Sequence, residues 1–155
     1  MHSAEILAQF PNGGAITVPF EVKRGSSDFL DLVKICQHFA KEGYKTIILP
    51  KVHYKDPLYK KYFSELNETK YAGKCPDLKI GDYFYEYESF VFPFNNRKIN
   101  NMLNRGIIQS NRLILNNNCG ATDNYIKRIA RHKMYSGGQI DELWIIKDSV
   151  LERLI

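Results

Sequence analysis

The chain has 155 residues, of which 44% are hydrophobic and 13% aromatic. This composition excludes a disordered polymer and suffices for one hydrophobic core, so we expect a single domain over residues 1–155. Three cysteines, Cys36, Cys75 and Cys119, lack the paired spacing of a disulfide framework or a zinc knuckle. No apolar run reaches the roughly 18 residues of a membrane span, and the N-terminus has no basic signal-peptide region. We therefore expect a cytoplasmic protein with no membrane partner.

The net charge of +5 is concentrated in one part of the sequence. Residues 97–133 contain eight basic residues and one acidic residue, so this stretch carries +7, whereas residues 1–96 are neutral and residues 134–155 carry −2. A basic excess of this kind indicates a polyanionic partner such as nucleic acid. The alternative is a solvated basic surface without a partner.

The first part of the chain alternates strand and helix. A strand is expected over residues 15–20, where Pro19 indicates the edge of a sheet. A helix that Ser27 caps follows, with acidic residues in its first turn and apolar residues on one side, and Gly43 ends it. A β-branched strand over residues 44–49 comes next.

The remaining elements complete an α+β pattern. Asp56-Pro57 has the form of a helix start, and the turn Gly81-Asp82 joins two strands over residues 78–80 and 83–90. Further elements are a short helix at 99–103, a strand at 113–115, a helix at 122–134 and strands at 143–146 and 150–155. The order β-α-β-α-ββ-α-β-α-β(β) predicts a mixed or antiparallel central sheet with helices packed on it. It has an N-terminal portion over residues 1–70 and a second portion over residues 70–155.

An acidic cluster is expected on the hairpin around Gly81-Asp82. With a two-residue turn, Asp77 lies opposite Glu86, and alternation along the strand puts Glu88 on the same face, with the tyrosines toward the core. Opposed carboxylates need a divalent cation, a basic side chain or a raised pKa as compensation. A solvent-exposed acidic face is the alternative, because it needs none of these.

Basic and amide side chains follow the hairpin and suit phosphate oxygens and base edges. We expect them to form a nucleic-acid-binding surface made of Arg97, Lys98, Asn101, Arg105, Arg112, Lys127, Arg128 and Arg131. Gln109 lies close to this set in the sequence and could orient substrate or water. Contacts that stack on bases would come from aromatic residues, for which the candidates are Tyr87, Phe94, Tyr125 and Tyr135.

The sequence Pro76-Asp77, followed by Glu86-Tyr87-Glu88, resembles the PD-(D/E)xK phosphodiesterase pattern. In that pattern an acidic pair on adjacent strands binds a metal that activates water. The resemblance implies that Asp77, Glu86 and Glu88 hold Mg²⁺ or Mn²⁺. Glu88 stands where the pattern has a lysine, and Lys79 or Lys98 could replace that lysine.

A second resemblance covers residues 70–147. The segment from Pro76 to Gly81, then Glu86, a short basic helix and the run Arg105-Gly106-Ile107-Ile108-Gln109-Ser110 are similar to CdiA-type C-terminal tRNA-nuclease domains. By position, Asp77, Glu86 and Gln109 are the matching residues and Glu88 is the departure. Domains of this type are metal-dependent PD-(D/E)xK-like enzymes in some branches and metal-independent ribonucleases of the barnase, EndoU and colicin type in others. The resemblance implies cleavage of RNA, with tRNA as a candidate substrate. If the chain is a toxin, it also implies a neutralising partner protein.

Three functional hypotheses follow from the sequence. The first is a small RNA nuclease whose catalytic residues are Asp77, Glu86, Glu88 and Gln109. The second is a non-catalytic nucleic-acid-binding or protein-binding module of a mobile element that retains a nuclease-like fold. The third is a metal-independent ribonuclease in which His53 acts as general acid or base. Metal-dependent cleavage separates the first hypothesis from the other two.

Overall fold

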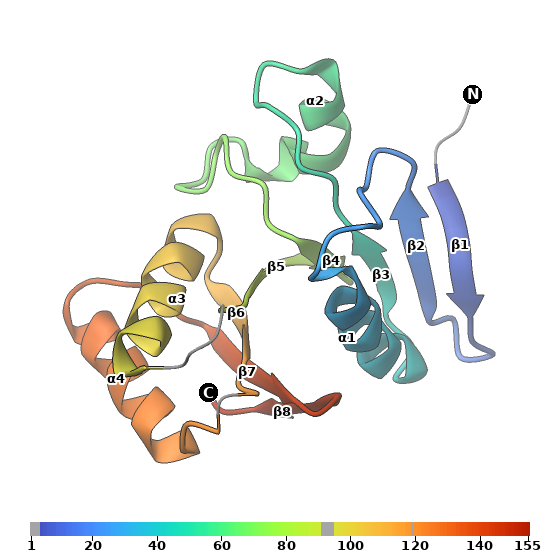
Figure 1. Ribbon diagram of the computed structural model, residues 1–155. Helices are drawn as coiled ribbons and strands as arrows, with labels where there is room; N and C mark the ends of the chain where they lie inside the picture. The colour runs from blue at the N-terminus through green and yellow to red at the C-terminus, as the bar shows by residue number, and fades with distance from the viewer. Residues whose placement is uncertain (1–3, 91–94, 119) are drawn as a thin grey trace. The chain divides into compact units, whose positions relative to one another are not determined.

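The described part of the chain contains four α-helices and eight β-strands, which confirms the α+β prediction. The computed structural model describes residues 4–90, 95–118 and 120–155 (Figure 1). Phe94 and Cys119 lie outside these residues. The chain divides into two compact units, Met1–Phe84 and Tyr85–Ile155. That the whole chain is one domain stays a prediction.

The sheet of the first unit has the strand order β1-β2-β3-β4. Strand β1 (Ala4–Gln9) is antiparallel to β2 (Ala15–Pro19), β2 is parallel to β3 (Lys45–Ile48), and β3 is antiparallel to β4 (Leu78–Ile80). The sequence did not predict β1. Because β1 covers the outer side of β2, the prediction that Pro19 marks a sheet edge is wrong. Pro19 lies beyond the residues of β2 that pair with β3, which end at Thr17, so its missing N–H removes no bond of that ladder.

Helix α1 (Phe29–Lys41) starts one residue later than a Ser27 cap would place it. Asp28 is the N-cap residue, and its side chain makes no capping hydrogen bond. The chain is already turning at this point, since the Phe29 N–H donates to the Ser26 carbonyl at 3.2 Å. The local turn therefore sets the start of the helix, and the predicted Ser27 cap is wrong.

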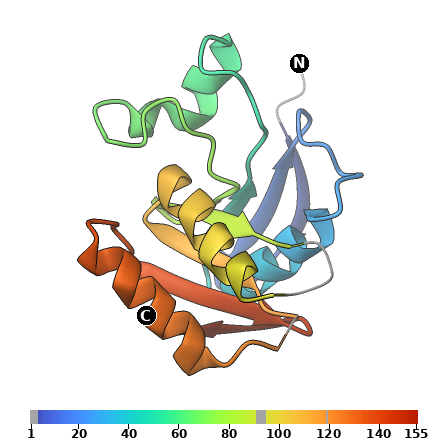
Figure 2. The same cartoon turned by 60° about the vertical axis from the view of Figure 1, so that its left-hand side comes forward.

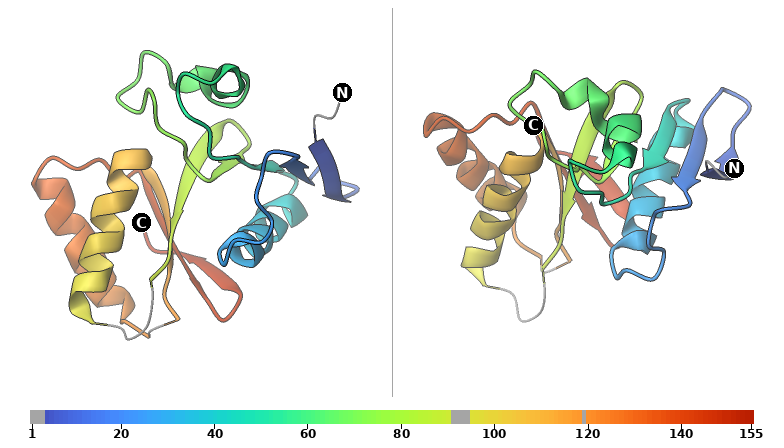
Figure 3. Two further views of the ribbon diagram at one scale, coloured as in Figure 1. Left: turned by 45° about the horizontal axis from the view of Figure 1, so that its top comes forward. Right: turned by 90° about the horizontal axis from the view of Figure 1, so that it is seen from above.

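Helix α1 packs very closely on the start of β2, and Figure 3 shows the helix beside the strands of this unit. A Cβ atom on Gly14 would lie 1.7 Å from the carbonyl oxygen of Ala40, so only glycine fits there. Gly43 ends the helix region with φ +99°, as a C-terminal glycine does. Under the helix, the Cys36 thiol is buried, and burial raises its pKa to about 12.

A cluster of buried hydrophobic side chains lies under α2 (Pro57–Phe63). A short 3₁₀ turn over Ser64–Leu66 extends this helix. The predicted start is confirmed: the Asp56 carboxylate accepts from the Leu58 N–H at 2.9 Å and Pro57 is the first helical residue. The buried residues of this cluster are Leu49, Tyr59, Phe63, Leu66 and Phe84. Strand β5 (Tyr83–Glu88) follows the predicted Gly81-Asp82 turn, where Gly81 has φ +58°.

The second unit alternates strands and helices. Its elements are β5, α3 (Asn96–Gln109), β6 (Arg112–Asn116), α4 (Asp123–Tyr135), β7 (Glu142–Lys147) and β8 (Val150–Arg153). Strands β5, β6 and β7 are parallel neighbours, and β8 returns antiparallel to β7. Helix α3 is longer than predicted. The Thr122 hydroxyl accepts from the Tyr125 N–H at 3.2 Å, which confirms the predicted start of α4.

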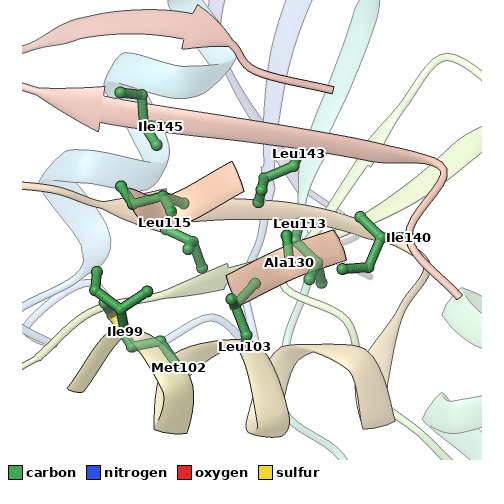
Figure 4. Close-up of a cluster of buried hydrophobic side chains, with 10 residues drawn as sticks. Ile99, Met102, Leu103, Leu113, Leu115, Ala130, Ile140, Leu143 and Ile145 are labelled. Atoms are coloured by element: carbon green, nitrogen blue, oxygen red, sulfur yellow. The ribbon is translucent and has the colours of Figure 1, made fainter. Parts of the chain in front are cut away.

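Helices α3 and α4 lie side by side over one face of this sheet (Figure 2). The two helices and the strands share a core of aliphatic side chains (Figure 4). Its fully buried members are Ile99, Met102, Leu103, Leu113, Leu115, Ile126, Ala130 and Leu143. Leu113 and Leu115 define the helix-covered face of β6, and register with them identifies the same face on β5 and β7.

Candidate functional site

Glu86 and Glu88 lie on the helix-covered face of β5. In the parallel pairing, Glu86 is level with Leu113 and Glu88 with Leu115, and both leucines belong to the core under α3 and α4. Glu86 is only 6% exposed. The sequence assigned the core side of β5 to the tyrosines, but β5 is buried on both faces, as parallel strands commonly are. The expectation of a solvent-exposed acidic face is therefore wrong at Glu86.

Helix α3 brings a cation to Glu88. The Arg105 Nε atom lies 3.1 Å from Glu88 Oε2, and the same guanidinium donates to the Ser89 carbonyl at 3.2 Å. Gly106 lies close to both strands here: a Cβ atom on it would lie 3.0 Å from Leu113 Cδ2 and 3.5 Å from Glu88 Cγ. Gln109 is four residues after Arg105 and so lies on the same side of α3, at its last residue. Three of the four predicted catalytic residues thus fall in one unit around β5 and α3.

Asp77 belongs to the first unit, where it directly precedes β4. Its carboxylate lies 2.8 Å from the Lys51 ammonium, and its backbone carbonyl accepts from the Leu49 N–H at 2.8 Å. Lys51 also donates to the Cys75 carbonyl at 2.6 Å. Sequence reasoning missed Lys51, because nothing in the spacing of residues 51 and 77 signals that they meet.

A pocket of about 320 Å³ opens beside Asp77. Its polar lining side chains are Glu21, Lys23, Ser26, Asp28, Lys51 and Asp77. The Glu21 carboxylate is oriented by the Tyr62 hydroxyl, which donates to it at 3.0 Å. The lining combines side chains of both charge signs with apolar residues such as Phe29, Leu32 and Ile48.

The two lysines suggested as replacements for the missing pattern lysine lie in different units, Lys79 in β4 and Lys98 in α3. The Lys79 ammonium is 2.6 Å from the Glu65 carboxylate and 5.5 Å from the centre of the Phe84 ring. Lys98 is half-buried in the first turns of α3. Lys51 pairs with Asp77 and Arg105 pairs with Glu88.

The fit of a divalent cation can be tested on these contacts. Within residues 4–90, 95–118 and 120–155, no group of three or more His, Cys, Asp or Glu side chains is placed to hold a metal ion. Asp77 and Glu88 each already contact a basic side chain. Mg²⁺ commonly takes only one or two carboxylates together with water and phosphate oxygens, so Glu86 and Glu88 remain chemically suited to it.

Comparison with known proteins adds no identity to this geometry. No family model, curated protein or solved structure matches the chain. The two resemblances noted in the sequence therefore stay expectations.

The predicted phosphate-binding residues differ in solvent exposure and in the contacts of their side chains. Exposed residues of this set are Arg97, Asn101, Arg105, Arg128 and Arg131, and Lys98 and Lys127 are half-buried. Arg112 is different: its side chain is 16% exposed and its Nε atom lies 2.6 Å from Glu142 Oε2. Arg112 therefore contributes to an internal network in this structure.

Glu142 is the centre of that network, which sequence reasoning missed. It accepts hydrogen bonds from the Tyr85 hydroxyl at 2.9 Å, the Arg112 Nε at 2.6 Å and the Trp144 indole N–H at 3.0 Å. Burial alone would raise the pKa of Glu142, but these donors and the nearby Arg153 together lower it. Burial and the bond to Glu142 raise the pKa of Tyr85.

The candidates for base stacking and for acid–base catalysis also differ in solvent exposure. Tyr87 is buried and its hydroxyl accepts from the Asn116 amide at 3.2 Å, so its ring is not available to a base. Tyr125 is half-buried, whereas Tyr135 is 92% exposed. His53 is exposed, and its Nδ1 accepts from the Lys55 N–H at 3.1 Å.

None of the described helices is both long enough and apolar enough to cross a bilayer.

Proposed function

We propose that this chain is a nuclease that cleaves RNA, with Glu86 and Glu88 in its active site. One observation carries the proposal: β5 presents both carboxylates to the side where α3 places Arg105 against Glu88 and Gln109 one turn further on. Acids, a guanidinium and an amide in one unit are the side chains that phosphodiester cleavage uses. Asp77 belongs to the proposal through the sequence pattern.

Charge compensation explains how these residues would act on a phosphodiester. A carboxylate with little exposure needs a cation, and Arg105 supplies one to Glu88. Glu86 and Glu88 would hold Mg²⁺ or Mn²⁺, which when bound activates water and stabilises charge on the phosphate. Arg105 is half-exposed, so its guanidinium can exchange Glu88 for a phosphate oxygen of the substrate. Gln109 would orient the substrate or the attacking water.

The test is cleavage of total RNA and of plasmid DNA by the purified chain with Mg²⁺, with Mn²⁺ and with EDTA. Glu86→Gln keeps the volume of the buried side chain and removes its charge. Glu152→Gln is the matched control, because Glu152 is an exposed glutamate in β8 of the same unit. We expect metal-dependent RNA cleavage that Glu86→Gln reduces by about 100-fold or more and that Glu152→Gln leaves unchanged.

A second measurement tests metal binding independently of RNA cleavage. Titration calorimetry with Mn²⁺ should show weaker binding to Glu86→Gln than to the Glu152→Gln control. Intact substrates in every condition would overturn the nuclease proposal. Cleavage that survives EDTA would reject the metal, and His53→Ala would then test the metal-independent mechanism.

A non-catalytic nucleic-acid-binding module is the second candidate function. It is favoured by the ion pairs of Asp77 and Glu88, because each carboxylate contacts a basic residue that compensates its charge without a metal ion. This candidate predicts RNA binding without cleavage. If the chain is a toxin, a neutralising protein partner would dock on its basic surface. The thiols of Cys36 and Cys75 suit the reducing cytoplasm, where we place the activity.

A further inference from the structure

A stripe of exposed side chains runs along α4. It consists of Asn124, Arg128, Arg131 and Tyr135, which we call the α4 stripe. The spacings of four, three and four residues put all four on one side of the helix, and each of them is exposed. The opposite side of α4 enters the core of the second unit. The stripe extends over about 16 Å at the rise of an α-helix.

The charge of α4 favours an anionic ligand along this stripe. Helix α4 contains Lys127, Arg128, Arg131 and Lys133 against the single acid Asp123, which gives a net +3 with histidine neutral. A cationic stripe on one helix attracts a polyanion without reading its sequence.

Tyr135 adds an aromatic platform at the end of the stripe. It is 92% exposed, and with Arg131 and Met134 it lines an open pocket of about 340 Å³. Within the described part of the chain, neither Arg131 nor Tyr135 makes a side-chain hydrogen bond, ion pair or ring contact. One turn earlier, the Arg128 guanidinium lies 5.4 Å from the centre of the Tyr125 ring, which orients it along the helix.

We propose that the α4 stripe binds single-stranded RNA, with one base stacked on Tyr135 and consecutive phosphates on Arg131 and Arg128. The proposal rests on the RNA-cleaving function proposed above and names the form of the substrate. A base can reach the flat face of an exposed ring only when it is not stacked and paired in a duplex. The stripe therefore selects single-stranded segments, such as loops, over helical RNA.

A protein partner fits the stripe less well than RNA does. The buried centre of a protein–protein interface is depleted of charged residues, whereas two of the four positions of the α4 stripe are arginines. Asn124 extends the stripe with a neutral donor and acceptor that can serve a sugar or a base edge.

The test measures binding in EDTA, so that cleavage does not interfere. The probes are a fluorescent 15-nucleotide single-stranded RNA without self-complementarity and the same strand annealed to its complement, followed by anisotropy. Tyr135→Ala should weaken binding of the single strand by about 5- to 150-fold and leave the duplex nearly unchanged. Tyr135→Phe, which keeps the ring, should bind within about twofold of the parent. Arg131→Gln should reduce the salt dependence of log Kd by about 0.7.

Matched controls lie in the first unit. Tyr54→Ala removes an exposed tyrosine, and Arg24→Gln removes an exposed arginine. Both controls should bind like the parent. Tyr135 is exposed enough that its substitution should leave the melting temperature unchanged, which circular dichroism verifies.

The outcomes separate this inference from the proposed function. If Tyr135→Ala binds the single strand as tightly as the parent, or loses duplex binding equally, the inference is wrong even when RNA is cleaved. If the stripe variants lose binding as expected and no RNA is cleaved in any metal, the inference stands and the nuclease proposal falls. Stripe variants that bind RNA normally but no longer bind an acidic partner protein would also overturn it.

Discussion

Replacing Glu142 by glutamine tests the network on the second unit's sheet. The glutamate oxygens accept from the Tyr85 hydroxyl, the Trp144 indole and the Arg112 guanidinium, at 2.9, 3.0 and 2.6 Å. A glutamine amide turns one acceptor into a donor, so either Trp144 or Arg112 loses its partner. An unsatisfied buried donor costs about 1–3 kcal/mol, and Arg112 also loses its counter-charge. We expect Glu142→Gln to lower the free energy of unfolding by about 3 kcal/mol at pH 7.

The pH dependence of this difference has a definite sign. The pKa of Glu142 in the folded state is lowered, so its ionised form stabilises the fold above its ordinary pKa of about 4.3. That contribution is lost as the pH falls through the lowered folded-state pKa, where the protonated glutamate resembles glutamine. The stability difference between parent and variant should therefore be full at pH 7 and shrink progressively below about pH 4.

Urea denaturation at pH 7, 5 and 3.5, followed by circular dichroism, measures this difference. Glu152→Gln is the control, because Glu152 is exposed and its substitution should change stability by no more than about 0.5 kcal/mol. The reasoning fails if Glu142→Gln is as stable as this control at pH 7. It also fails if the gap widens as the pH falls.

Three further experiments test the packing of α1, the burial of Cys36 and the N-cap of α4. Gly14→Ala places a Cβ atom 1.7 Å from the Ala40 carbonyl oxygen and should cost more than about 3 kcal/mol in urea denaturation, whereas Gly25→Ala, with open space around it, should be nearly neutral. The Cys36 thiol, with its pKa raised to about 12, should resist maleimide in the native protein and react after denaturation, as peptide mapping would show. Thr122→Ala removes the N-cap side chain of α4 and should lower the free energy of unfolding, measured by urea denaturation, by about 1 kcal/mol. An unchanged free energy of unfolding would reject the capping role.

Local signals in the sequence predicted most of the elements. The Asp56-Pro57 start of α2, the Gly81-Asp82 turn and the Thr122 start of α4 are all found, because each depends on a few neighbouring residues. Strand β1 was missed because its sequence lacks a run of β-branched residues and its Ile6 and Leu7 side chains are exposed. Pairing with β2 forms this strand, and such pairing is not written in a local pattern.

The candidate site was predicted less completely than the fold. Period-2 alternation correctly put Glu86 and Glu88 on one face, but it assumed that only one face of β5 is buried. The contacts of these acids depend on residues distant in the sequence, as the Glu88–Arg105 pair does. Glu142 needs partners 30 and 57 residues away, at Arg112 and Tyr85, so only the tertiary structure reveals it.

The strand order within each unit has a consequence for synthesis on the ribosome. In space the strands follow one another as they do along the chain, β1 to β4 in the first unit and β5 to β8 in the second. Each strand that emerges therefore finds its neighbour already made, and none has to wait for a later segment to insert between the two. Such ordering keeps contacts short in sequence and allows the first unit to fold while the second is still being translated. Folding of both sheets should thus proceed vectorially, from the N-terminus onward.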